Sequence, residues 1–134
     1  MKRLSVLFSL ALIIVLIISC SEPNSPSIDN PNGIFNGKIT LYDSSGTNPV
    51  QGNISLIRDN TTDFGGTWSL QNGQSGNLTG SINNMKVNIN LDPNMIDDNT
   101  FLIGDLVGQS IEGQWFHSGV MGVNNKGTFV AKSF

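Results

Sequence analysis

The sequence of 134 residues contains one cysteine and one histidine, so it is poor in the side chains that most often bind metals or act as nucleophiles. A single cysteine excludes a disulfide bond within the chain. Charged residues are also few, at 13%, and the ten acidic residues outnumber the seven basic ones. Nucleic-acid binding requires a basic patch or stripe, so this composition argues against a nucleic-acid partner.

The longest apolar run lies at the N-terminus. Lys2 and Arg3 precede the run from Leu4 to Ile18, which is about 15 residues long, whereas a membrane-spanning helix needs about 20. A basic start, a short apolar core and a small residue at its end are typical of a secretory signal peptide. Cys20 follows Ser19 at the point where the apolar run stops.

The segment Ile17-Ile18-Ser19-Cys20 resembles the lipobox of bacterial lipoproteins. The resemblance implies that residues 1–19 are removed as a signal peptide and that Cys20 is lipidated, with palmitate-like acyl chains that anchor the protein to a membrane of the cell envelope. Ser21 is not the aspartate that favours retention in the inner membrane of enteric bacteria, so the resemblance points to the outer membrane. The alternatives are an uncleaved anchor and an ordinary signal peptide followed by an unmodified cysteine.

The chain after this signal divides into a short tether and one domain. Residues 20–32 are rich in serine, proline and asparagine, a composition that cannot form a core and predicts a flexible tether. Residues 33–134 are enough for a single domain. Without Lys2 and Arg3, five basic residues remain against ten acidic ones, a balance of −5, so anionic lipid headgroups would not attract the domain.

Beyond Gly33, alternation of apolar and polar residues predicts β-strands, and no helical period is convincing. Turn-forming residues separate eight runs, which are Ile34–Tyr42, Val50–Arg58, Phe64–Leu70, Asn77–Ile82, Met85–Leu91, Thr100–Val107, Ser110–His117 and Gly127–Lys132. Most connections are short, which favours antiparallel pairing of successive strands. We therefore predict an all-β fold, an eight-stranded up-and-down meander barrel, with a two-sheet β-sandwich as the alternative.

Glycine recurs at one position of these runs. Six runs place it between two apolar residues of the same face, at Gly37, Gly52, Gly66, Gly80, Gly104 and Gly113. A glycine inside a strand permits a sharp bend or a close approach of another segment, and glycines on the inner face allow a strongly curved sheet to close on itself. The pattern predicts that these six glycines face the interior of the barrel.

The meander with Gly66-Thr67-Trp68 and Gly113-Gln114-Trp115 resembles the calycin group, the avidin and lipocalin barrels. Lipocalins carry the glycine-x-tryptophan motif on their first strand, whereas here it falls on the third and seventh runs. The resemblance implies a small molecule bound inside the barrel. The predicted inner face lacks the polar side chains that hold biotin, so we expect an apolar or aromatic ligand. The expected lining residues are Trp68, Trp115, Phe64 and Phe129, and core packing is the alternative role of both tryptophans.

The sequence offers little for catalysis or metal binding. His117 is predicted at the barrel rim with no partner nearby in the sequence, and a lipidated Cys20 is neither a nucleophile nor a ligand. Asp92, Asn94, Asp97 and Asp98 do not have the spacing of a calcium loop. We expect no enzyme activity, no catalytic residue, no metal site and no cofactor. Only a cluster of Asp92, Asp97, Asp98 and His117 around a pocket would favour an enzyme.

These observations favour a membrane-anchored, non-enzymatic lipoprotein whose barrel binds a small apolar ligand or a macromolecular partner. The alternative is a filled-core structural protein or an interaction protein of the hydrolase-inhibitor type. The apolar segment Ser118–Val123 is either an exposed partner contact or a plug that covers one barrel end, and we expect the plug because an open end would wet the core.

Overall fold

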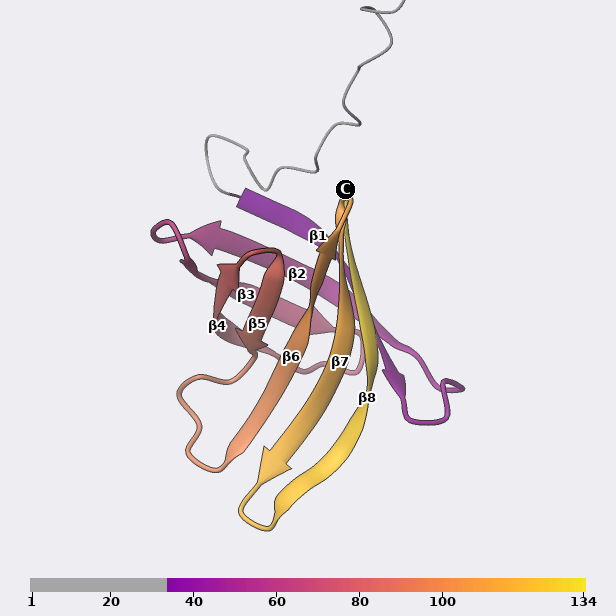
Figure 1. Cartoon of the computed structure of the whole chain (residues 1–134). Helices are drawn as coiled ribbons and strands as arrows, with labels where there is room; N and C mark the ends of the chain where they lie inside the picture. Colours follow the sequence, from indigo (N-terminus) through magenta and orange to yellow (C-terminus); the bar gives the residue numbers. More distant parts are fainter. Residues whose placement is uncertain (1–33) are drawn as a thin grey trace, which may run out of the picture.

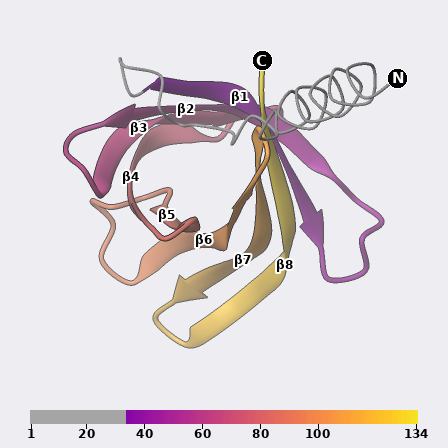
Figure 2. The same cartoon turned by 45° about the horizontal axis from the view of Figure 1, so that its top comes forward.

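The computed structural model describes residues 34–134, so the predicted signal peptide, Cys20 and the tether lie outside the described residues. The described part contains eight strands in succession, β1 (Ile34–Asp43), β2 (Val50–Arg58), β3 (Asp63–Leu70), β4 (Ser75–Asn83), β5 (Lys86–Asn90), β6 (Asp98–Val107), β7 (Ser110–Gly119) and β8 (Gly122–Ser133). Each strand pairs antiparallel with the next, and β8 returns to pair with β1 (Figures 1 and 2). The predicted meander barrel is confirmed, and the sandwich alternative is wrong because the sheet closes.

The alternation of residue types decides which face of each strand lines the barrel. On β1, Phe35, Ile39 and Leu41 are buried whereas Lys38 is exposed. With the same alternation on the other strands, sixteen buried hydrophobic side chains in all form one cluster, which includes Leu102, Ile111 and Phe129. No polar or charged residue from Phe35 to Phe134 is buried. Among residues 34–134 there is no helix long and apolar enough to cross a membrane.

The inward-facing glycines are where neighbouring strands approach most closely. Gly66 lies between buried Phe64 and Trp68 on β3, and a Cβ atom at Gly66 would overlap the backbone carbonyl oxygen of Ser55 on β2. Similar overlaps with the backbone of the adjacent strand occur at Gly37, Gly52, Gly80, Gly104 and Gly113. Since a side chain at these positions would force the strands apart, the predicted close approach of a neighbouring strand is confirmed. The role of the glycines in closing the sheet stays a prediction.

Strand ends differ from the prediction where the strands leave the barrel body. The predicted turn Ser118–Asn125 is mostly strand, and only Val120 and Met121 connect β7 to β8, in a hairpin that projects beyond the body (Figure 1). A register shift after His117 accompanies this extension, and both faces of the hairpin meet solvent there, so the apolar alternation that marks a strand is lost. Val120 and Met121 are 86% and 94% exposed, so the expected plug is wrong.

The topology gives the barrel two unlike ends. The β1–β2, β3–β4, β5–β6 and β7–β8 connections all lie at one end, which we call the mouth. The β2–β3, β4–β5 and β6–β7 turns lie at the opposite end, together with Phe134 and the start of β1. Figure 1 shows the β5–β6 loop and the β7–β8 hairpin far from the C-terminus.

Candidate functional site

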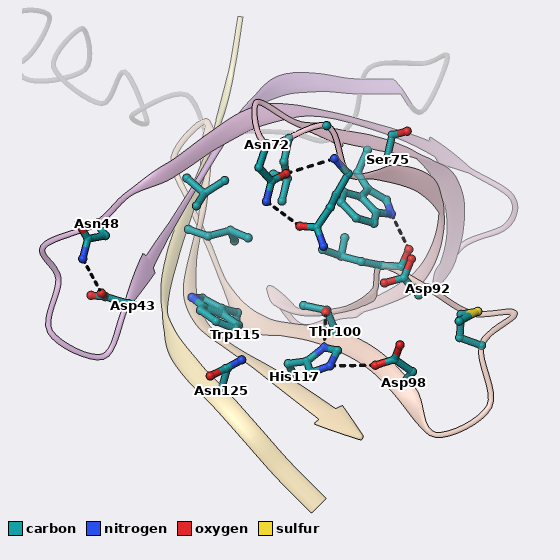
Figure 3. A pocket seen from close by; sticks show the side chains of 18 residues that line it. Asp43, Asn48, Asn72, Ser75, Asp92, Asp98, Thr100, Trp115, His117 and Asn125 are labelled. Atoms are coloured by element: carbon teal, nitrogen blue, oxygen red, sulfur yellow. Dashed lines mark hydrogen bonds and ion pairs between the residues drawn. The ribbon is translucent and has the colours of Figure 1, made fainter. Parts of the chain in front are cut away.

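The mouth opens into a cavity of about 800 Å³, a volume in the range typical of small-molecule sites. Its apolar lining consists of Leu41, Val50, Trp68, Leu70, Leu91, Met95 and Trp115. Its polar lining consists of Asp43, Asn48, Asn72, Gln74, Ser75, Asp92, Asp98, Thr100, His117 and Asn125 (Figure 3). All four connections at the mouth or the strand ends beside them contribute residues. The barrel therefore has a packed interior toward the end opposite the mouth and a partly polar cavity toward its mouth.

Trp68 is held against the barrel wall by a hydrogen bond that spans two strands. It lies on β3 opposite Gly76 of β4, and its indole Nε1 donates to the carbonyl oxygen of Leu91, just after β5. A Cβ atom at Gly76 would lie 3.2 Å from that Nε1. The glycine thus provides the space in which the indole crosses β4.

Trp115 is held in the same way on the other side of the barrel. It lies on β7 opposite Gly127 of β8, and its Nε1 donates to the carbonyl oxygen of Tyr42 on β1 at 2.7 Å. A Cβ atom at Gly127 would lie 2.7 Å from this Nε1 and would overlap the Tyr42 carbonyl oxygen. The two tryptophans lie on strands β3 and β7, four strands apart and so on opposite sides of the eight-stranded barrel. Each indole passes over a glycine of the adjacent strand and bonds to the strand beyond it or to the residue just after that strand.

Two of the four predicted lining residues line the cavity. Trp68 and Trp115 both do, and the N–H group of each indole is bonded to a backbone carbonyl of the barrel. Phe64 and Phe129 are 8% and 1% exposed, belong to the core cluster, and are not among the lining residues. The alternation predicts that both phenylalanine side chains point into the barrel. How far each lies from the mouth depends on the stagger of the strands, which the alternation does not give.

The structure gives His117 partners that the sequence did not indicate. Thr100 lies directly opposite His117 in the β6–β7 pair, and its hydroxyl lies 3.0 Å from the imidazole Nδ1. On the other side of the ring, Nε2 lies 2.9 Å from a carboxylate oxygen of Asp98 (Figure 3). When Nε2 carries the proton, it donates to Asp98 while Nδ1 accepts from Thr100. These two contacts fix the orientation of the imidazole at the mouth.

Asp43 uses its carboxylate to shape the β1–β2 connection. One oxygen accepts from the Ser45 hydroxyl at 2.7 Å and from the backbone N–H groups of Ser45 and Thr47, and the other accepts from the Asn48 amide. The Ser45 bond is the largest influence on the pKa of Asp43, which these hydrogen bonds together hold below its usual value despite some desolvation. Asp43 is therefore an ionised structural residue at the edge of the cavity.

Asp92 has no such support. Its carboxylate has no hydrogen-bond or ion-pair partner among residues 34–134, although Asp92 lines the cavity (Figure 3), as Trp68 does. Burial raises the pKa of Asp92 above its usual value, the nearby Asp98 carboxylate raises it further, and His117 opposes both. A carboxylate kept partly desolvated and unpaired beside a cavity is characteristic of functional sites.

Asp92→Asn is expected to stabilise the fold at pH 7. Because the folded-state pKa of Asp92 is raised, its ionisation costs stability as the pH rises through that pKa, and the cost is absent below the ordinary aspartate pKa of about 3.9. Urea unfolding should show a gain of about 0.5 kcal/mol or less at pH 7, since Asp92 is only partly buried and solvent screens its charge, and no gain at pH 3. Asp59→Asn, which removes the same charge from the opposite end, is the control. A loss of stability in Asp92→Asn at pH 7 would contradict this assignment.

Asp92, Asp98 and His117 thus meet around the cavity, whereas Asp97 is not part of its lining. The hydroxyl–imidazole–carboxylate order of Thr100, His117 and Asp98 is the order that activates a nucleophile, but such catalysis also needs donors for an oxyanion. In the part of the chain that the structure describes, no group of three or more histidine, cysteine, aspartate or glutamate side chains could hold a metal ion. Asp105 faces outward and pairs with Lys86 at 2.7 Å, away from the mouth.

No protein-family model, no curated protein and no solved structure matches this chain. The candidate site therefore stands on the geometry of the mouth and on the residues that line it.

Proposed function

We propose that this protein is a lipid-anchored binding protein of the calycin kind, which holds a small aromatic or apolar molecule in the mouth of its barrel. The cavity of about 800 Å³ between Trp68 and Trp115 carries this proposal. Its apolar residues provide contact area, and its polar residues at the rim would fix the orientation of a bound molecule. The backbone bonds of the two indoles support a preformed site, because they hold both rings in place without a ligand.

The proposed anchor is Cys20, acylated after removal of residues 1–19, in the outer membrane of a bacterial cell envelope. Lys2, Arg3, the apolar run and the cysteine at its end support it. A chain held by several acyl groups stays on a bilayer, since each buried methylene contributes about 0.8 kcal/mol. The tether would join β1 at the end of the barrel opposite the mouth, so membrane attachment leaves the cavity accessible.

Two variants test anchor and cavity independently. Cys20→Ser should move the protein out of the membrane fraction of its host and leave its ligand bound. Val50→Trp, which adds bulk at a lining position, should leave the protein in the membrane and expel the ligand. Native mass spectrometry of the protein, purified from its host in mild detergent, detects the retained small molecule as added mass that denaturation removes.

The matched control is Val107→Trp, since Val107 is 55% exposed and lies at the end of the barrel opposite the mouth. Urea unfolding of both tryptophan variants checks that they fold. Unchanged processing and membrane fractionation of Cys20→Ser would refute the anchor. Absence of a bound small molecule from the parent, together with no binding of added aromatic compounds, would refute the ligand function.

The exposed side chains of the mouth favour a macromolecular partner as the second candidate. Ile96, Val120 and Met121 are 86–94% exposed on the β5–β6 and β7–β8 connections. The affinity of a protein partner that binds there should be unchanged by Val50→Trp and reduced by Met121→Ser. The affinity of a small ligand in the cavity should be reduced by Val50→Trp and unchanged by Met121→Ser.

A further inference from the structure

The charge of the cavity lining has one sign, apart from a single imidazole. Asp43, Asp92 and Asp98 line the cavity together with His117, and no lysine or arginine of residues 34–134 does. Acidic groups in a concave site with apolar walls produce a negative potential that attracts cations. An anionic ligand would have no basic partner there, so the lining discriminates among ligands that could equally well pack against the tryptophans.

The three carboxylates are not equally available to a ligand. Asp43 is occupied by the hydrogen bonds of its own loop, and Asp98 uses one oxygen on His117. Asp92 has both oxygens free of partners within the described part of the chain, and burial disfavours its charge. A positively charged ligand would relieve that cost, whereas a neutral ligand would leave it in place.

Asp92 lies next to an aromatic ring. A Cβ atom at Gly76 would lie 3.2 Å from Trp68 Nε1 and 3.5 Å from Asp92 Oδ1, so indole and carboxylate border the same small space. A cation is attracted both by a carboxylate and by the face of an indole ring. Because the N–H of Trp68 is bonded to Leu91, the indole would offer a ligand its π surface rather than a hydrogen-bond donor.

We infer that the ligand of the cavity is a small organic amine, whose apolar or aromatic body packs against Trp68 and Trp115 and whose ammonium group lies beside Asp92 and Asp98. This inference rests on the proposed function, because it names the ligand class of the same cavity. It gives the unpaired carboxylate of Asp92 a role that a purely apolar ligand would not. It also predicts that Asp92→Asn improves stability and weakens binding at once.

Three probes with the same aromatic body test the inference. They are 2-(1-naphthyl)ethylamine, 2-(1-naphthyl)ethanol and 1-naphthaleneacetate, which end in an ammonium, a hydroxyl and a carboxylate. Titration calorimetry on the full chain in a non-ionic detergent, corrected with protein-free micelles, measures each affinity at pH 7 and low salt. We expect the amine to bind about tenfold more tightly than the alcohol, and the carboxylate to bind most weakly. Asp92→Asn should reduce amine affinity about tenfold and leave the alcohol unchanged, while Asp59→Asn changes neither.

The outcomes separate this inference from the proposed function. If the alcohol or the carboxylate binds as tightly as the amine, the amine inference is overturned and the small-molecule function stands. If Asp92→Asn and Asp98→Asn both leave the preference for the amine intact, the inference is overturned as well. If none of the three probes binds and the protein from its host carries no small molecule, the proposed function itself fails. Preference for the amine that disappears in Asp92→Asn supports both.

Discussion

Gly66→Ala is expected to destabilise the barrel by about 3 kcal/mol or more, although it adds a single methyl group. The new Cβ would overlap the carbonyl oxygen of Ser55 and crowd the Cα of Leu56 on the neighbouring strand. No rotamer change relieves this overlap, because both partners belong to the backbone of a paired strand. Relief requires β2 and β3 to separate, which weakens their hydrogen bonds and opens the curved wall. Equilibrium unfolding in urea measures the loss of stability. A variant that fails to fold also agrees with the prediction.

The matched control is Gly65→Ala on the same strand. Gly65 faces the other side of the sheet, and a Cβ there would lie 3.4 Å from its nearest neighbour, a carboxylate oxygen of the flexible Asp59 side chain. We expect a change within about 0.5 kcal/mol, or a slight gain from reduced entropy of the unfolded chain. Equal stabilities of the two variants would show that the inward glycines do not determine closure.

Trp68→Phe is expected to cost about 2–3 kcal/mol, and Trp115→Phe about 1 kcal/mol. Both substitutions keep an aromatic ring and remove an N–H that satisfies a backbone carbonyl. The two carbonyls differ in environment, because the Trp68 bond to Leu91 is buried whereas the Trp115 bond to Tyr42 is only partly buried. Water can replace the donor at the partly buried Tyr42 carbonyl more readily than at the buried Leu91 carbonyl, so the first variant leaves an unsatisfied buried group.

Urea midpoints at an unchanged m-value measure this difference. Phe116→Leu provides a control for aromatic truncation away from the lumen, since Phe116 stacks on Phe101 with the ring centroids 5.2 Å apart and makes no such bond. If Trp115→Phe were more destabilising than Trp68→Phe, the assignment of the buried bond would be wrong. If the proposed amine packs against the ring faces rather than the N–H groups, both variants should keep naphthylethylamine binding within a few fold.

The apolar face of most strands could be predicted because a strand alternates with a fixed period of two residues. That period placed Phe35, Ile54 and Leu102 inside, and the structure confirms them. It failed for Met85, which the alternation assigns to the inner face but which lies in the β4–β5 turn with a positive φ of 68°. Asn84 has a φ of 48°, so the turn uses two left-handed residues, as tight hairpins do.

The candidate site was only half predictable. The tryptophans stood out through their motif, but the polar groups of the mouth did not, because they lie on loops and strand ends where alternation carries no information. Asp92 and Asp98 looked like ordinary turn residues. His117 appeared isolated because its partner Thr100 is 17 residues away in the sequence, and only the pairing register of β6 with β7 places it opposite the ring.

The sequence by itself determined the class of fold, its eight strands, its inner face and the six inward-facing glycines, because each of these follows from a short local period. The tertiary structure alone decided that the mouth holds a cavity and that Asp92 remains unpaired beside Trp68. It alone also decided that Trp115 reaches across Gly127 to Tyr42, which is 73 residues from Trp115 in the sequence. These features depend on the stagger between strands and on barrel closure, which no local pattern encodes.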